Sequence, residues 1–132
     1  MSAETDLVDA LEANAAVVAL LQISGVSPTE LRIYPDVVAQ EIDLPAVAFQ
    51  RLATEYNNTI HAIAPTSAQI SIDIWCMADT RSVAESIGDA VEGALAPAAF
   101  LLVGRRGEID PDDPDRIIWA TVLSVVRNQQ LS

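Results

Sequence analysis

The sequence of 132 residues contains no lysine, and all seven of its basic residues are arginine. They are outnumbered by 19 acidic residues, so the formal net charge is −12. Surfaces that bind nucleic acids or anionic membranes need clustered cations. The composition therefore disfavours both kinds of binding. The absence of lysine also excludes Schiff-base chemistry and the phosphate-binding P-loop.

Cysteine and histidine occur only once each, as Cys76 and His61. One cysteine cannot form an intrachain disulfide, and no cysteine–histidine spacing typical of zinc sites exists. The acidic N-terminus lacks the basic and apolar regions of a secretory signal, and no apolar run reaches the ~18 residues of a membrane span. We therefore expect a cytosolic protein without a membrane segment.

Apolar residues are abundant, at 51% of the chain with a mean hydropathy of +0.29. The length suits a single domain, residues 1–132, which can bury roughly two-thirds of its unfolded surface. Apolar surface left over after folding is an aggregation hazard unless it is covered by other subunits. We therefore expect the protein to act by binding protein subunits.

Hydrophobic periodicity predicts the element order α-β-β-α-β-β, with a connector at 22–37 and loops at 54–65 and 104–115. The expected elements are helices 5–21 (capped by Thr5) and 79–95 (capped by Asp79), and strands 45–53, 67–77, 100–103 and 116–127. Strands joined by loops pair as antiparallel hairpins. The sequence thus predicts an α+β fold, an antiparallel sheet of about four strands with two helices packed on one face.

The second face of this sheet is the predicted subunit interface. In strand 67–77 three isoleucines alternate with polar residues and a tryptophan, and strand 116–127 is apolar on both faces. The interface candidates are Ser71, Asp73, Trp75, Trp119 and Leu123. The two tryptophans are either interface anchors or core residues, since aromatic side chains serve both roles.

Catalytic, cofactor and metal sites are not indicated. His61 lies in an expected loop, and the sequence has no nucleophile elbow to accompany it. An EF-hand counted from Asp110 would have Asp115 in place of its glycine and Thr121 in place of its glutamate, so the calcium motif fails. Arg105 and Arg106 could bind an anion, but ion pairs with carboxylates of this chain or a partner explain them more simply.

Four segments resemble a known family. They are Leu-Pro-Ala-Val-Ala-Phe-Gln-Arg at 44–51, Ala-Gln-Ile-Ser-Ile-Asp-Ile-Trp-Cys at 68–76, the helix at 79–95, and Leu-Arg-Ile-Tyr-Pro at 31–35 behind a leading helix. Together, over residues 5–95, they resemble the tail-completion (tail terminator, or head–tail joining) family of long-tailed bacteriophages and gene transfer agents.

The resemblance implies a hexameric ring that caps the completed tail tube, docks to the head connector and leaves an axial channel. DNA would pass through without specific binding, and an acidic lumen fits this because like charges repel. The protein would assemble in the host cytoplasm and lie at the head-proximal end of the tail in the virion. The loop residues expected to contact the tube or connector are Asn57, Asn58, His61, Arg105, Arg106, Asp110, Asp112 and Asp113.

Two alternatives stay open. One is a neighbouring virion component, either a head–tail connector adaptor or a minor tail protein. The other is a small α+β ligand-binding domain or enzyme, which would require a deep polar pocket that holds His61 with a carboxylate.

Overall fold

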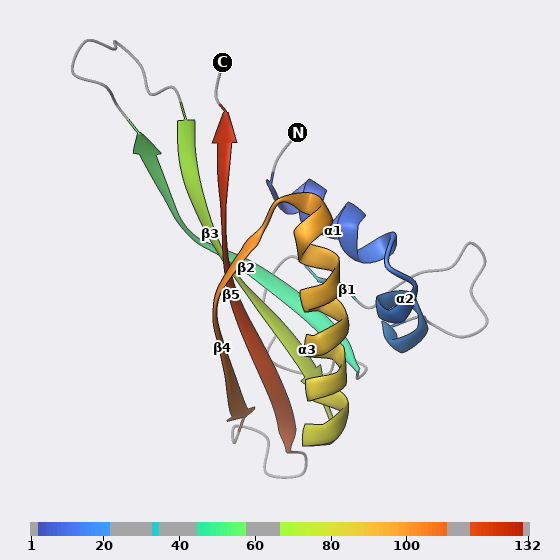
Figure 1. Ribbon diagram of the computed structural model, residues 1–132. Helices are drawn as coiled ribbons and strands as arrows, with labels where there is room; N and C mark the ends of the chain where they lie inside the picture. The colour runs from blue at the N-terminus through green and yellow to red at the C-terminus, as the bar shows by residue number, and fades with distance from the viewer. Residues whose placement is uncertain (1–2, 22–32, 35–44, 58–66, 111–116, 131–132) are drawn as a thin grey trace.

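The computed structural model describes residues 3–21, 33–34, 45–57, 67–110 and 117–130. Its five-stranded sheet has the strand order β1-β2-β3-β5-β4, and the helices lie on one side of it (Figure 1). The elements are α1 (Ala3–Glu12), α2 (Ala15–Leu21), β1 (Ile33–Tyr34), β2 (Ala46–Asn57), β3 (Ser67–Ala78), α3 (Arg81–Leu95), the 3-10 helix η1 (Ala96–Ala98), β4 (Leu101–Asp110) and β5 (Ile118–Gln130).

The expected α+β class is confirmed, but the sheet is mixed rather than wholly antiparallel. The additional strand, β1, lies within the expected irregular connector and pairs in parallel with β2 through Ile33 with Val47 and Tyr34 with Ala48. The four long strands pair antiparallel, as predicted. A two-residue strand carries no readable periodicity, so the sequence pattern could not reveal β1.

The expected helix 5–21 is in fact two helices, because Asn14 caps the second one. Its side-chain oxygen accepts hydrogen bonds from the backbone N–H groups of Ala16 at 3.0 Å and Val17 at 3.1 Å. Such a cap satisfies backbone donors that a helix start leaves open. Thr5 is therefore inside α1 and not its cap.

Helix α3 was predicted almost correctly, but its cap is Thr80 rather than Asp79. The Thr80 hydroxyl accepts a hydrogen bond from the backbone N–H of Val83 at 3.3 Å, which starts the helix at Arg81. Val83 itself is exposed, and the buried stripe of α3 starts one residue later, at Ala84. Pro97 ends the run within η1.

The largest error in the sequence prediction concerns β4. The expected short strand at 100–103 is a ten-residue strand, and residues 104–110 of the expected loop at 104–115 are part of it. Pairing with β5 continues to Asp110 opposite Ile118, with an irregularity between Leu102 and Gly104. Two glycines suggested a turn, but glycine is also tolerated in a strand beside a bulge.

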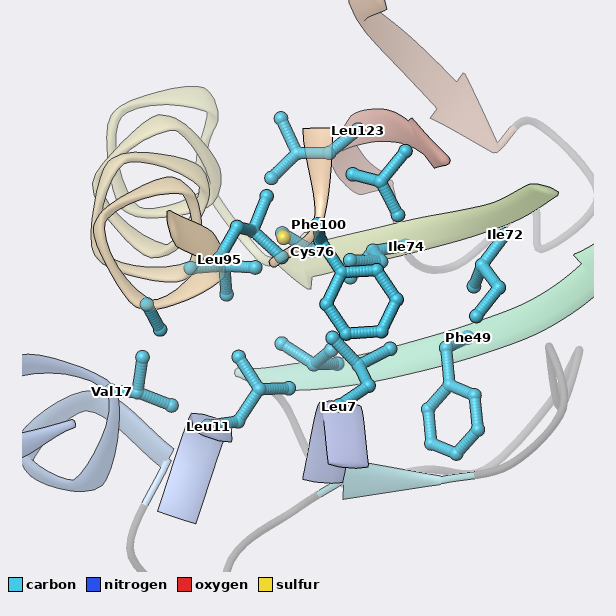
Figure 2. Close-up of a cluster of buried hydrophobic side chains, with 14 of the residues drawn as sticks. Leu7, Leu11, Val17, Phe49, Ile72, Ile74, Cys76, Leu95, Phe100 and Leu123 are labelled. Carbon is cyan, nitrogen blue, oxygen red and sulfur yellow. The ribbon is translucent and has the colours of Figure 1, made fainter. Parts of the chain in front are cut away.

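The main core lies between the sheet and the helices (Figure 2). Figure 2 labels ten of its side chains: Leu7, Leu11, Val17, Phe49, Ile72, Ile74, Cys76, Leu95, Phe100 and Leu123. A second, smaller buried cluster forms separately from Ala46, Ala48, Met77, Ile118, Ala120 and Val122. Its members on β3 and β5 alternate with those of the main core, so it lies on the other face, which we call the outer face.

Helix α3 packs unusually close to β5 at Gly88. A Cβ atom added there would lie 2.8 Å from Cγ2 of Thr121 and 3.1 Å from Nη2 of Arg105. The glycine therefore sets the distance between helix and sheet, because any side chain would push them apart.

Candidate subunit interface

The centre of the outer face is a polar cluster around Asp73 on β3. Asp73 is only 7% exposed, and its Oδ1 accepts a hydrogen bond from the Ser124 hydroxyl at 2.8 Å. Ser124 is its cross-strand partner on β5. A buried carboxylate is costly unless hydrogen bonds and a cation compensate it. The cation is Arg106, whose Nη2 lies 3.6 Å from Oδ2 of Asp73.

Arg106 reaches from β4 across this face and makes three kinds of contact there. Its Nε donates to Oε1 of Glu108 at 2.8 Å, and its Cζ lies 5.8 Å from the centre of the Trp75 ring. The hydrogen bond to Glu108 raises the pKa of the Arg106 guanidinium. Partial burial opposes this shift, and the negative charges of Glu108 and Asp73 add to it. The outer face thus presents a preformed patch of one cation, two carboxylates and an aromatic ring.

The five interface candidates from the sequence divide between the two faces. Ser71, Asp73 and Trp75 lie on the outer face, where Trp75 also packs against the second buried cluster. Trp119 and Leu123 lie on the helix side, where Trp119 is half-buried against the main core. Leu123 is fully buried, so its side chain does not reach the surface.

The adjacent arginines point to opposite faces, as side chains alternate in a strand. Arg105 turns toward α3, where its Nη1 lies 2.9 Å from Oδ1 of Asp89 and its Nη2 donates to the Glu85 carbonyl at 3.2 Å. Both arginines therefore form ion pairs within their own chain, which is the simpler of the two explanations given above. They belong to a strand and not to the expected loop.

The remaining loop candidates are placed only in part. Asn57 and Asp110 are the last residues of β2 and β4, so they end strands instead of lying in loops. Asn58, His61, Asp112 and Asp113 lie outside the described residues.

Exposed apolar side chains gather at the two edges of the sheet. Leu101, Val103 and Ile109 on β4, and Leu52 and Tyr56 on β2, are each more than half exposed. Within the described residues β4 pairs only with β5, and β1 covers only the start of β2. Periodicity does not tell an edge strand from a central one, so these residues could not be recognised as a group from the sequence.

A groove of about 610 Å³ lies between the first turns of α3 and strands β4 and β5. Arg81, Glu85, Arg105, Ile109 and Trp119 are among the residues that line it. The Arg81 guanidinium is paired with Glu85 at 3.0 Å. Among the described residues, the lining mixes ion pairs with apolar side chains and holds no histidine or cysteine.

The described part of the chain gathers no group of three metal-ligating side chains. None of its helices is long and apolar enough to cross a membrane. Burial raises the pKa of the Cys76 thiol to about 12, with the charge of Arg105 opposing the shift. Cys76 is therefore an inert core thiol at neutral pH.

Comparisons with known proteins point to one family. The family model described as "Tail completion protein gp17" matches residues 5–119. A solved structure titled "Virion of native gene transfer agent (GTA) particle" contains a similar chain, with 16% sequence identity and a TM-score of 0.54. The alignment covers 93% of this chain and 91% of that chain, and at this identity it supports the fold alone. Comparison with curated proteins gives no match.

Proposed function

The chain belongs to the tail completion protein family, and from this premise we propose that it closes the head-proximal end of a phage or gene transfer agent tail tube as a homo-oligomeric ring. The family is one of structural virion proteins, so the chain is a structural tail protein and not an enzyme. The ring has six subunits, as the resemblance implies, and joins the tube to the head connector. This extends the family membership to a specific place in the particle.

One observation is the main support for the proposed ring. Exposed apolar side chains lie on both edges of a single sheet, on β2 and on β4. The β2 and β4 edges lie on opposite sides of the sheet, so they cannot pair with each other within one subunit. A head-to-tail contact between copies covers both edges. Such heterologous contacts generate rings when the rotation closes.

Charge supports the passage of DNA through this ring. The chain carries a net charge of −12, and DNA is repelled by a channel wall of the same sign. The ring therefore guides DNA without holding it.

The test is to delete the gene from a particle-producing strain and examine the products by electron microscopy. We expect DNA-filled heads without attached tails and tails of irregular length, with normal particles restored by the wild-type gene. Gold-labelled antibody should mark the head-proximal tail end of wild-type particles. Label on tail-less heads of a tail-tube mutant would instead favour a connector adaptor, and label along or at the far end of the tail would favour a minor tail protein. Normal particles in the deletion strain would refute the proposal.

A further inference from the structure

We infer that successive subunits of the ring join edge to edge, with residues 104–110 of β4 in one copy pairing antiparallel with residues 51–57 of β2 in the next. The inference rests on the proposed function and specifies which surfaces of the chain meet. The occupant of each edge is thus a second copy of this chain.

Of the features that keep natural edge strands apart, β4 has one irregularity near its start, between Leu102 and Gly104, and it lacks lysine and proline. Edges are usually protected by lysine, proline or a charge that points outward along the edge. From Leu101 to Asp110 there is no lysine or proline. Both arginines are drawn away from the edge, Arg105 to α3 and Arg106 across the outer face to Asp73. A strand edge left open in this way is a template for another strand.

Among the described strands, β2 has no neighbour on the side away from β3 beyond the two residues that pair with β1. Parallel pairing with β1 uses Val47 and Ala48 only, and residues 49–57 have β3 as their one neighbour among the described strands. The arginine of this stretch, Arg51, is held by Glu4 of α1. The side chains that remain exposed here include Leu52 and Tyr56, which are apolar or aromatic.

The strand directions fit a continuous sheet. β2 runs antiparallel to β3, β3 to β5 and β5 to β4, so β4 and β2 run in opposite directions. A second copy placed beside the first with the same face outward therefore brings its β2 antiparallel to β4. The contact repeats the pairing type of all the long strands.

Arg106 and Gly107 of β4 are level with Ala48 and Val47, which pair with β1, so pairing this part of β4 with the open stretch of β2 requires an offset. Through the ladders Gly107 is level with Thr121, Cys76 and Val47, whereas pairing Gly107 with Thr54 of the next copy moves that copy by several residues. An offset of roughly 20 Å across four strands of about 19 Å total width corresponds to a strand tilt of roughly 45°, close to the usual tilt of closed sheets. The same offset leaves room for β1 beside Val47.

A two-fold contact between two β4 strands explains less. It would leave the β2 edge uncovered, and a symmetric pairing about the middle of the strand would set Arg105 or Arg106 beside its own copy. Like charges directly opposite each other destabilise a strand pair. The head-to-tail contact covers both edges and avoids this.

Disulfide cross-linking tests the contact, with Gly107→Cys in one copy and Thr54→Cys in the other. Ladder partners show that both positions face the helix side, since Gly107 pairs with Thr121 and Thr54 with Ile70. Directly opposed positions in a ladder are close enough for a disulfide. A Cβ at Gly107 has its nearest neighbour 4.0 Å away, so the substitution fits. The matched control is Ala53→Cys, which pairs with Ser71 and points to the outer face.

The two proteins, each with one introduced cysteine besides the buried Cys76, are mixed under ring-forming conditions, oxidised and separated by non-reducing electrophoresis. We expect Gly107→Cys with Thr54→Cys to give a mixed dimer, at least tenfold more than Gly107→Cys with Ala53→Cys. Rings seen by electron microscopy without this dimer would overturn the edge contact and leave the proposed function standing. A dimer of Gly107→Cys with itself would overturn it, because these two cysteines are far apart in the head-to-tail contact. A protein that forms no rings and does not cap tails would overturn the proposed function and the edge contact with it.

Discussion

The close approach of α3 to β5 at Gly88 gives a stability prediction with an internal control. Replacing glycine by alanine inside a helix raises the free energy of unfolding by about 1 kcal/mol, because glycine loses more backbone freedom on folding. At Gly93 nothing lies within 4 Å of an added Cβ, so the full gain should appear. At Gly88 the same methyl group would meet Cγ2 of Thr121 at 2.8 Å.

The expected sign at Gly88 follows from the size of this clash. Overpacking of a close-packed core costs about 1–3 kcal/mol, which exceeds the helix gain. The Arg105 tip can move, but Thr121 is a short branched side chain that is buried on β5. We therefore expect Gly88→Ala to lower the free energy of unfolding by about 1 kcal/mol and Gly93→Ala to raise it by about 1 kcal/mol.

Urea denaturation of the two variants, followed by tryptophan fluorescence and circular dichroism, measures this difference of about 2 kcal/mol. At this chain length the difference corresponds to roughly 8 °C in melting temperature. If Gly88→Ala is as stable as Gly93→Ala, helix and sheet are not in the close contact described. A second readout is ring assembly, since Arg105 joins α3 to β4 and its displacement should weaken assembly of Gly88→Ala only.

Three further outcomes are expected. Ile109→Lys, on the proposed contact, should reduce the fraction of subunits in rings at least tenfold at equal folded stability, because lysine protects an edge from pairing. The control Val83→Lys on α3 should assemble normally. Sedimentation velocity measures the ring fraction, and equal assembly of both variants contradicts the edge contact. Asp73→Ala should cost about 1–3 kcal/mol of unfolding free energy, because Arg106 loses a buried partner, and a urea titration that shows no change would contradict the role of the outer-face cluster. Cys76 should resist iodoacetamide in the native protein at pH 8 and react after denaturation, as mass spectrometry can show; rapid native labelling would contradict its burial and its pKa of about 12.

The parts of the fold that the sequence predicted are those with strong periodicity. The alternation in β3 placed its isoleucines in the main core and Asp73 and Trp75 on the outer face, as the structure has them. The stripe in α3 located that helix to within two residues at its start. Both patterns extend over many residues, so a single exceptional residue does not obscure the periodicity.

The failures have local physical causes. Asn14 sits in the apolar stripe of the first helix, so the pattern continues through a residue whose side chain in fact ends one helix and caps the next. Gly104 and Gly107 resembled a turn, yet both pair with β5. In each case the local backbone conformation differs from the one that the surrounding sequence pattern predicts. The cause is a single capping side chain in the first case and the absence of a side chain in the second.

The candidate interface was harder to predict than the fold. The sequence pointed to the outer face, but Arg106 reaches Asp73 only because β5 lies between β4 and β3 and sets their relative register. The strand order also decides which apolar residues lie at an edge, and Leu101 and Leu123 illustrate the difference. Both are leucines in expected strands, yet Leu101 is exposed and Leu123 is fully buried.

The arginines that the structure describes hold elements of this acidic chain together. Each of the five arginines within the described residues forms an ion pair with a carboxylate of the same chain: Arg51 with Glu4, Arg81 with Glu85, Arg105 with Asp89, Arg106 with Glu108 and Arg127 with Asp6. Three of these pairs, those of Arg51, Arg105 and Arg127, connect a strand to a helix. An arginine engaged in this way is a poor phosphate ligand, because binding DNA would require breaking the pair. The same ion pairs therefore stabilise the sheet–helix packing, and in the proposed ring the surplus of acidic groups would repel DNA.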